Sequence, residues 1–214
     1  PNILDAYAGY RHSNAFQLMA GMMKPRQTMD YIPNPGATDF IDRTIITGLL
    51  VQSREIGVAM EGKIGGLYYY GGIFNGTKKR VNNNNKFYSI GRIQYTFENL
   101  FPGTFQLGIH GSAGDSPGVR SGGKGPVLRG KRAIYGGDFR FESNSLLLAA
   151  EYLAGELETE SLPNEKELIS GYYVTGGYRF SEQTMALARW QSWGQKINKF
   201  RDSKLTLGVN HNFT

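Results

Sequence analysis

Two residue types that hydrolases use stand one residue apart in His110-Gly111-Ser112. Successive side chains of a β-strand point to opposite faces, so this spacing places the imidazole and the hydroxyl on the same face. A histidine can activate a serine nucleophile, but the chemistry also needs a third group that orients the histidine. No such group is evident beside the pair. We therefore predict that the chain has no catalytic residue and is not an enzyme.

A second set of residues suits anion binding. Arginine keeps its charge in proteins, and its planar guanidinium contacts phosphate through two parallel hydrogen bonds. Nine basic residues are predicted to line an anion path: Lys24, Arg26, Arg43, Arg54, Arg92, Arg132, Arg140, Arg179 and Arg189. The same face carries acids: Asp5, Glu55, Glu61, Asp138, Glu142 and Glu151. Each arginine therefore has an alternative role as an ion-pair partner that only stiffens the structure.

Composition limits the other chemistries. The chain has 214 residues, a formal net charge of +6 and no cysteine. Without cysteine it can form neither a disulfide nor a thiolate metal site, and we predict no metal and no cofactor. The modest positive charge favours an anionic partner, although we predict no nucleic-acid partner. No stretch approaches the roughly 20 apolar residues of a membrane helix.

Alternation of apolar and polar residues recurs in blocks of about nine to eleven residues, whereas helical periodicity is scarce. The pattern predicts eleven strands, at 2–10, 15–23, 54–62, 67–75, 87–97, 104–112, 132–142, 146–156, 169–180, 184–193 and 203–214. Strands of this length, rich in glycine and aromatic residues, are typical of an all-β, transmembrane, antiparallel up-and-down β-barrel. A soluble β-sandwich is the alternative, but its apolar face would have to bury many glycines and tyrosines.

The connections between these strands alternate in length. The long ones are 24–53, 76–86, 113–131, 157–168 and 194–202, and the short ones are 11–14, 63–66, 98–103, 143–145 and 181–184. Outer-membrane barrels alternate short periplasmic turns with long outer loops in this way. An antiparallel barrel needs an even number of strands to close, so we expect at least one upstream strand to be missing. Residues 1–214 are then one domain, the C-terminal part of a barrel of roughly 12–16 strands.

The two faces of the predicted strands differ in polarity. Leu107 and Ile109 alternate with His110 and Ser112, and Tyr135 and the neighbouring apolar positions alternate with charged ones. An arginine facing lipid at mid-depth costs roughly 2–4 kcal/mol, so the charged set is expected to face a wet interior. Aromatic residues near strand ends are expected to form interfacial girdles: Tyr10, Phe97, Phe101, Phe141, Phe180, Trp193 and Phe213.

The longest connection, 24–53, exceeds the length of a simple turn. Loops of about thirty residues are usually functional or disordered, and this one contains three prolines and the apolar run IITGLL, which favour order. A loop of this kind folded into the mouth of a barrel would narrow the pore.

Four short motifs around this loop carry a family resemblance. They are Asp5-Ala-Tyr7, Gly21-Met-Met-Lys24-Pro25, Phe40-Ile-Asp42-Arg43 and Arg54-Glu-Ile56-Gly57-Val58. In order and spacing they resemble the phosphate-selective porin O and P family. The resemblance implies an outer-membrane, usually trimeric porin in which 24–53 is the constriction loop. It also implies passive diffusion of small anions, phosphate or similar oxyanions, along basic residues of the loop and wall.

Two other functions stay open at this point. The barrel could be a structural anchor for a larger assembly, or an outer-membrane phospholipase, whose His-x-Ser pair on a strand is similar to His110 and Ser112. In those enzymes the pair must face lipid, whereas the alternation here sends both residues inward. The expected location is the outer membrane of a Gram-negative-type bacterium. The expected partners are outer-membrane lipid, lipopolysaccharide (which the basic start of connection 78–86 would attract), small inorganic anions and further copies in a homotrimer.

Overall fold

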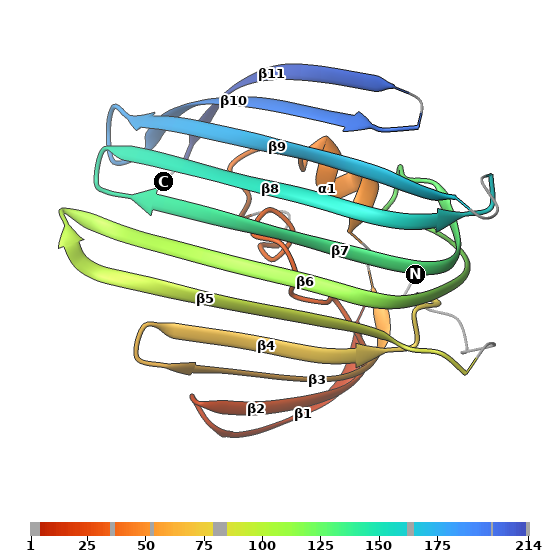
Figure 1. The fold of residues 1–214 in the computed structure, drawn as a ribbon. Helices are drawn as coiled ribbons and strands as arrows, with labels where there is room; N and C mark the ends of the chain where they lie inside the picture. Colours follow the sequence, from red (N-terminus) through yellow and green to blue (C-terminus); the bar gives the residue numbers. More distant parts are fainter. Residues whose placement is uncertain are drawn as a thin grey trace.

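A computed structural model describes residues 5–34, 37–51, 54–78, 85–161, 165–197 and 199–212, without the side chains of 99–101. Eleven strands form one antiparallel sheet, in which each strand pairs with its neighbours in the sequence (Figure 1). The strands are β1 (Ala6–Ser13), β2 (Phe16–Met23), β3 (Glu55–Ile64), β4 (Leu67–Phe74), β5 (Tyr88–Phe101), β6 (Gly103–Arg120), β7 (Val127–Glu142), β8 (Leu146–Thr159), β9 (Lys166–Arg179), β10 (Thr184–Gln195) and β11 (Phe200–His211). All eleven predicted strands are confirmed. β1 and β11 form the two edges of the sheet, so closure of the barrel stays a prediction.

The predicted short connections overlap the observed turns at one end of the sheet, although β5 and β6 extend into the predicted connection 98–103. The predicted long connections at the other end are partly wrong. Gly65 has a φ of 57° in the two-residue turn between β3 and β4, a conformation that glycine adopts without strain. The predicted long connection 113–131 is wrong, because β6 and β7 stay paired as far as Arg120 and Val127. Connections 157–168 and 194–202 are likewise shorter than predicted. Most of the predicted 78–86 loop lies outside the described residues.

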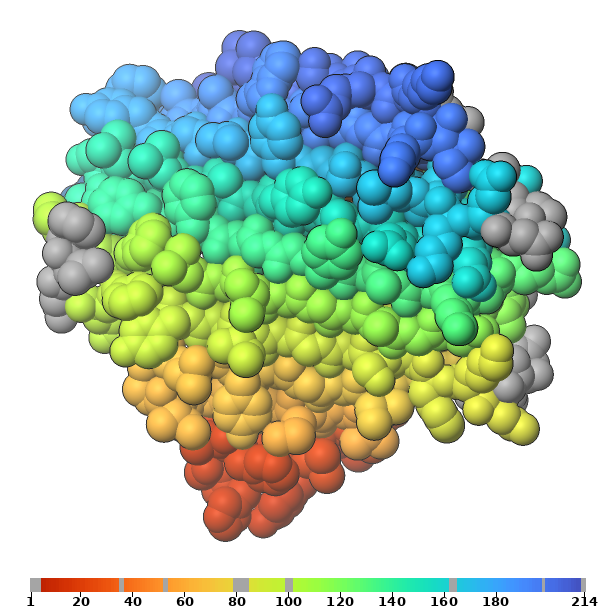
Figure 2. Space-filling view, in the orientation of Figure 1, coloured from red at the N-terminus to blue at the C-terminus, as the bar shows by residue number. Residues whose placement is uncertain are grey.

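The alternation separates the two faces as predicted. On the outer face, which Figure 2 shows as a continuous surface over the strands, Ile109 is 65% exposed and Leu207 is 72% exposed. Arg92 and Arg132, which belong to the opposite set, are each only 2% exposed. The prediction that Trp193 belongs to the aromatic girdle is wrong, because its side chain packs against a buried inner cluster. The exposed tryptophan of that strand is Trp190. The side chains of Phe101 and Phe213 lie outside the described residues.

The inner face is drier than the sequence indicates. Buried apolar side chains form three clusters on it, one of which joins Ile46 and Leu50 of the connecting segment to Ile134 and Leu153 of the sheet. The expectation of a uniformly wet interior is therefore wrong for these regions. The reason is that residues 24–51, the inner segment, cover the wall and remove its apolar side chains from water.

The inner segment lies behind the sheet in the view of Figure 1 and contains a short helix, α1 (Ile45–Leu50), that the sequence analysis does not predict. The Thr44 hydroxyl caps the helix by accepting a hydrogen bond from the Thr47 N–H. At its other end, the N–H groups of Gly123 and Lys124 in the β6–β7 turn each donate to the Gly48 carbonyl at 3.0 Å. In the described residues, no helix is long and apolar enough to cross a membrane.

Candidate functional site

A cavity of about 350 Å³ lies between the inner segment and the inner wall. Its lining combines the two: Met29, Asp30, Ile32, Pro33, Ala37, Thr38, Asp39 and Phe40 come from the inner segment, and Arg92, Gln94, Gln106, Arg140, Tyr173, Thr175 and Arg189 come from the strands. Three of the nine predicted anion-path residues therefore meet at one cavity. The wall residues reach it because they occupy alternate, inward positions of β5, β6, β7, β9 and β10.

Buried carboxylate and amide groups hold the inner segment against the wall. Both oxygens of Glu151 accept backbone hydrogen bonds, one from the Met29 N–H at 2.9 Å and the other from the Asp30 N–H at 3.2 Å. Gln191 accepts a hydrogen bond from the N–H of Ile45 at the start of α1, at 2.8 Å. These contacts satisfy backbone donors that would otherwise be buried without a partner. The position of the inner segment is thus fixed by side chains of β8 and β10.

A second part of the inner segment is held by arginines. Arg140 donates two hydrogen bonds to the Asp39 carboxylate, at 2.8 and 3.0 Å. Arg189 donates to the Asp42 carbonyl at 2.9 Å, and its guanidinium lies 4.5 Å from the centroid of the Phe40 ring. The Phe40-Ile-Asp42-Arg43 motif of the sequence therefore lies across the wall arginines.

Arg92 forms a buried ion pair in the wall. It donates two hydrogen bonds to Asp138, at 2.6 and 2.7 Å, and both side chains are at most 2% exposed. Arg92 also donates to the Gln27 carbonyl of the inner segment at 3.1 Å. A bidentate pair of this kind is geometrically specific, and its positive charge is largely neutralised.

Three basic residues of the inner segment and Arg54, which immediately precedes β3, form a group that we call the basic cluster: Lys24, Arg26, Arg43 and Arg54. The Lys24 ammonium lies 4.5 Å and the Arg43 guanidinium 4.9 Å from the centroid of the Tyr31 ring. Burial, and next the charges of Arg43 and Arg54, lower the pKa of Lys24 to about 8. Burial likewise raises the pKa of Tyr31, which lies among these cations. The cluster thus concentrates positive charge at one side of the inner segment.

The nine predicted residues differ in how far their charge is neutralised. Six have a carboxylate within ion-pair distance: Arg26 with Glu61, Arg54 with Asp5, Arg92 with Asp138, Arg132 with Glu55, Arg140 with Asp39 and Glu142, and Arg179 with Glu142. In the described part of the chain, Lys24, Arg43 and Arg189 contact carbonyl oxygens and aromatic rings instead.

Arg132 and Arg179 are not brought to the cavity. Arg132 is fully buried, and its guanidinium lies 3.3 Å from the centroid of the Tyr88 ring. Arg179 lies at the end of β9, where it pairs with Glu142 at 3.6 Å. Both positions are separate from the residues that line the cavity.

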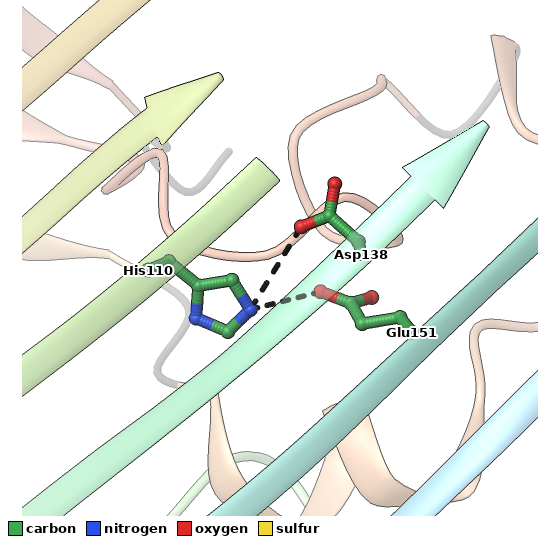
Figure 3. Close-up of side chains that lie close together, drawn as sticks. All are labelled: His110, Asp138 and Glu151. Carbon is green, nitrogen blue, oxygen red and sulfur yellow. Dashed lines mark ion pairs between the residues drawn. The ribbon is translucent and has the colours of Figure 1, made fainter. Parts of the chain in front are cut away.

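His110 and Ser112 face inward as predicted, but they have different partners. The Ser112 hydroxyl accepts hydrogen bonds from Tyr88 at 2.5 Å and from Gln27 at 2.9 Å. The His110 Nε2 atom points toward two carboxylates, 3.2 Å from Glu151 and 4.0 Å from Asp138 (Figure 3). The sequence analysis places both acids on the inward face but does not predict that they lie beside His110. The strand register could have identified them, because Asp138 lies directly opposite Glu151 on neighbouring strands.

Comparison with known proteins places this geometry in context. The family model for phosphate-selective porin O and P matches residues 1–126, which include β1 to β6 and the whole inner segment. The match covers more than half of the chain. No curated protein sequence matches it significantly.

Two solved structures share the fold. Outer-membrane expressed OmpT of Vibrio cholerae has a TM-score of 0.72 at 14% identity, and the alignment covers 100% of this chain. A loop L8 deletion mutant of OmpT, an outer membrane protein of the same organism, has a TM-score of 0.68 at 15% identity and 94% coverage. The chain spans 66% and 67% of the length of these two proteins, respectively. At these identities the likeness concerns the fold alone.

Proposed function

The chain belongs to the phosphate-selective porin O and P family, and on this premise we propose that it lets small anions diffuse passively through the outer membrane. An outer-membrane porin is what the family and the fold support directly. The preference for anions, with phosphate or similar oxyanions as the permeant class, is the finer proposal.

The observation that carries the anion preference is the set of inward basic groups that have no carboxylate partner among the described residues. Lys24 and Arg43 lie together in the basic cluster, and Arg189 lies in the cavity wall. A pore selects ions by the sign of the charges at its narrow point. Cations that are already paired contribute little to this field, so these three residues are the proposed main determinants.

The inner segment is the proposed constriction loop, as predicted for 24–53. Its support is the network that fixes it to the inner face, through Glu151 of β8, Gln191 of β10 and Arg140 of β7. A loop held in this way would narrow the lumen, because side chains of the wall keep it in place. Arg189, Gln94 and Gln106 would offer hydrogen bonds to a solute in the cavity, and the buried Arg189 Nε has no hydrogen-bond partner in the described structure.

The remaining expectations extend this proposal. We place the short turns at the periplasmic end, and we expect a homotrimer in contact with outer-membrane lipid and lipopolysaccharide. We also propose that the protein is not an enzyme. Its support is that the Ser112 hydroxyl accepts hydrogen bonds from Tyr88 and Gln27, whereas in the described residues neither ring nitrogen of His110 makes a hydrogen bond to it.

A structural anchor is the second candidate function, and one observation favours it. Leu50 of α1 is fully buried against the inner face, in a cluster with Leu128 and Leu153. Apolar packing of this kind fills a lumen and does not conduct ions. If the rest of the lumen were filled in the same way, the barrel would serve as a scaffold.

Conductance of the purified full-length protein in planar bilayers distinguishes the two functions. Under a salt gradient we expect discrete channels and a reversal potential of the sign that anion permeation gives. A cation-selective reversal potential would contradict the anion proposal, and an absence of channels would favour the anchor. Phospholipid hydrolysis by wild type that is lost in Ser112→Ala would overturn the proposal that the protein is not an enzyme.

A further inference from the structure

One cluster of buried polar groups combines side chains in a way that the proposed anion path does not require. His110 of β6, Asp138 of β7 and Glu151 of β8 project from three adjacent strands toward one point (Figure 3). One donor atom from each residue lies within 4.8 Å of the other two. We propose that these three side chains bind a divalent transition-metal ion such as Zn²⁺.

The histidine provides evidence that is independent of the two acids. Its side chain is 0% exposed, yet neither Nδ1 nor Nε2 makes a hydrogen bond. The 3.2 Å approach of Nε2 to Glu151 therefore brings the two atoms together without hydrogen-bond geometry. A buried imidazole that makes no hydrogen bond is unfavourable. A metal ion between Nε2 and the carboxylates would satisfy the nitrogen that points toward them.

The charges also call for a cation. Asp138 and Glu151 carry two negative charges, and Arg92 supplies one positive charge in direct contact with Asp138. All of these side chains are buried, where an unbalanced charge is costly. The Arg92 guanidinium binds Asp138 from one side and leaves a second lone pair on each of its oxygens. The same holds for the Glu151 oxygen that accepts one hydrogen bond from Met29.

Two glycines provide the space for this cluster. A β-carbon on Gly136 would lie 2.7 and 2.8 Å from Cε1 and Nε2 of His110. A β-carbon on Gly108 would lie 2.5 Å from the Asp138 carboxylate. Real side chains do not tolerate such contacts, so the wall carries no side chain at the two positions on which the cluster packs.

The donor set indicates the class of metal. One imidazole nitrogen and two carboxylate oxygens suit Zn²⁺, Mn²⁺ or Fe²⁺, whereas Ca²⁺ and Mg²⁺ prefer sites made of oxygen alone. Glu151 also holds the Met29 and Asp30 N–H groups of the inner segment. A bound metal would therefore connect three strands to the inner segment. Because the donors are covered, we expect the ion to enter during folding.

Cobalt provides a direct test, because it substitutes for these metals and absorbs visible light. The full-length protein is stripped of metal by a chelator while unfolded and then refolded in detergent with Co²⁺. We expect one Co²⁺ per chain, a visible absorption band, displacement by Zn²⁺ and a higher unfolding temperature with metal than without. Failure to bind Co²⁺ at stoichiometric amounts would overturn the proposal and would favour a proton on His110 as the cation.

Variants identify the ligands. The chain has three histidines, and both others, His12 and His211, are exposed. The double variant His12→Gln/His211→Gln should keep the band, whereas His110→Gln and Glu151→Gln should each weaken binding by about 100-fold or more. Co²⁺ binding that survives in His110→Gln would overturn the assignment.

A further variant, His110→Cys, tests the site by the appearance of a new absorption band, and this test remains useful if the other variants fold poorly. Because the chain has no cysteine, a thiolate-to-cobalt band in His110→Cys can only come from position 110. We expect that band, and its absence in a folded variant that still binds Co²⁺ would contradict the site. Channel conductance of the metal-free protein tests the porin proposal separately, because none of the metal ligands is assigned to the anion path.

Discussion

The buried wall arginines and the basic cluster have the same kind of charge in opposite situations. Arg92 meets Asp138 through two short hydrogen bonds and is almost fully buried. Lys24 and Arg43 instead contact backbone carbonyls and the Tyr31 ring, next to other cations. The first arrangement fixes the structure, and the second leaves charge available to a solute. The number of inward arginines is therefore a poor guide to ion selectivity, and their partners must be known.

The largest effect is expected from breaking the buried pair. Asp138→Ala leaves the Arg92 guanidinium buried without its carboxylate, which should lower the free energy of unfolding by about 3–5 kcal/mol. Urea unfolding in lipid vesicles, with chelator present, measures it. The double variant Asp138→Ala/Arg92→Met should recover most of the loss, and a double variant as unstable as the single one would contradict the explanation.

Removing charge from the basic cluster should change selectivity and not stability. Lys24→Gln/Arg43→Gln deletes two unpaired charges, each worth about 1 kcal/mol at 4 Å in water, so the anion-to-cation permeability ratio should fall by about tenfold or more. The reversal potential under a salt gradient measures it. The matched control is Arg140→Gln/Asp39→Asn, which removes an ion pair of no net charge from the cavity. An equal change in the control would show that paired and unpaired cations count alike.

The basic cluster should also respond to pH. The pKa of Lys24 is lowered to about 8, so the side chain is mostly charged at pH 7 and mostly neutral at pH 9. As pH rises through this range, one charge is lost, and the permeability ratio should fall by up to about fivefold. Lys24→Arg keeps its charge throughout and should give a flat profile. The same decline in that variant would assign the titration to another group.

The smallest effect is expected at an exposed pair. Arg179 and Glu142 are 3.6 Å apart, with side chains 33% and 42% exposed, so solvent screens their attraction. Arg179→Gln should change the free energy of unfolding by about 0.5 kcal/mol and leave the permeability ratio unchanged. Urea unfolding and the reversal potential are measured together. A shift in selectivity at this position would extend the anion path beyond the cavity and the basic cluster.

Much of the fold could be predicted because the alternation of apolar and polar residues is visible within each strand separately. Strict alternation identifies each strand and its faces, as at Ile109 and His110. Residues 113–131 are an exception, since their glycines, serines and prolines are typical of a loop. The structure pairs β6 as far as Arg120 with β7 from Val127, with a register shift between Pro117 and Val119. The helix α1 was missed because six residues are too few to show a helical period.

For the candidate site, strand parity identifies inward basic positions but gives neither their contacts nor which of them reach the cavity, and Arg132 and Arg179 do not. All nine basic positions follow from strand parity and the loop, whereas neutralisation depends on which acid lies opposite. The Arg140–Asp39 pair joins a strand to the inner segment across 101 residues, and no local pattern gives that distance. The His110 carboxylates needed the register of three strands, which parity alone does not supply.

The attachment of the inner segment also sets an order of events during folding. Its anchors lie far along the chain, with Met29 and Glu151 separated by 122 residues and Ile45 and Gln191 by 146. Contacts between distant residues pay a large loop-closure entropy before they form. The segment therefore cannot dock until β8 and β10 are in place, although it is synthesised long before them. With the proposed role of the segment as constriction loop, narrowing of the lumen would be a late step of folding that follows completion of the wall.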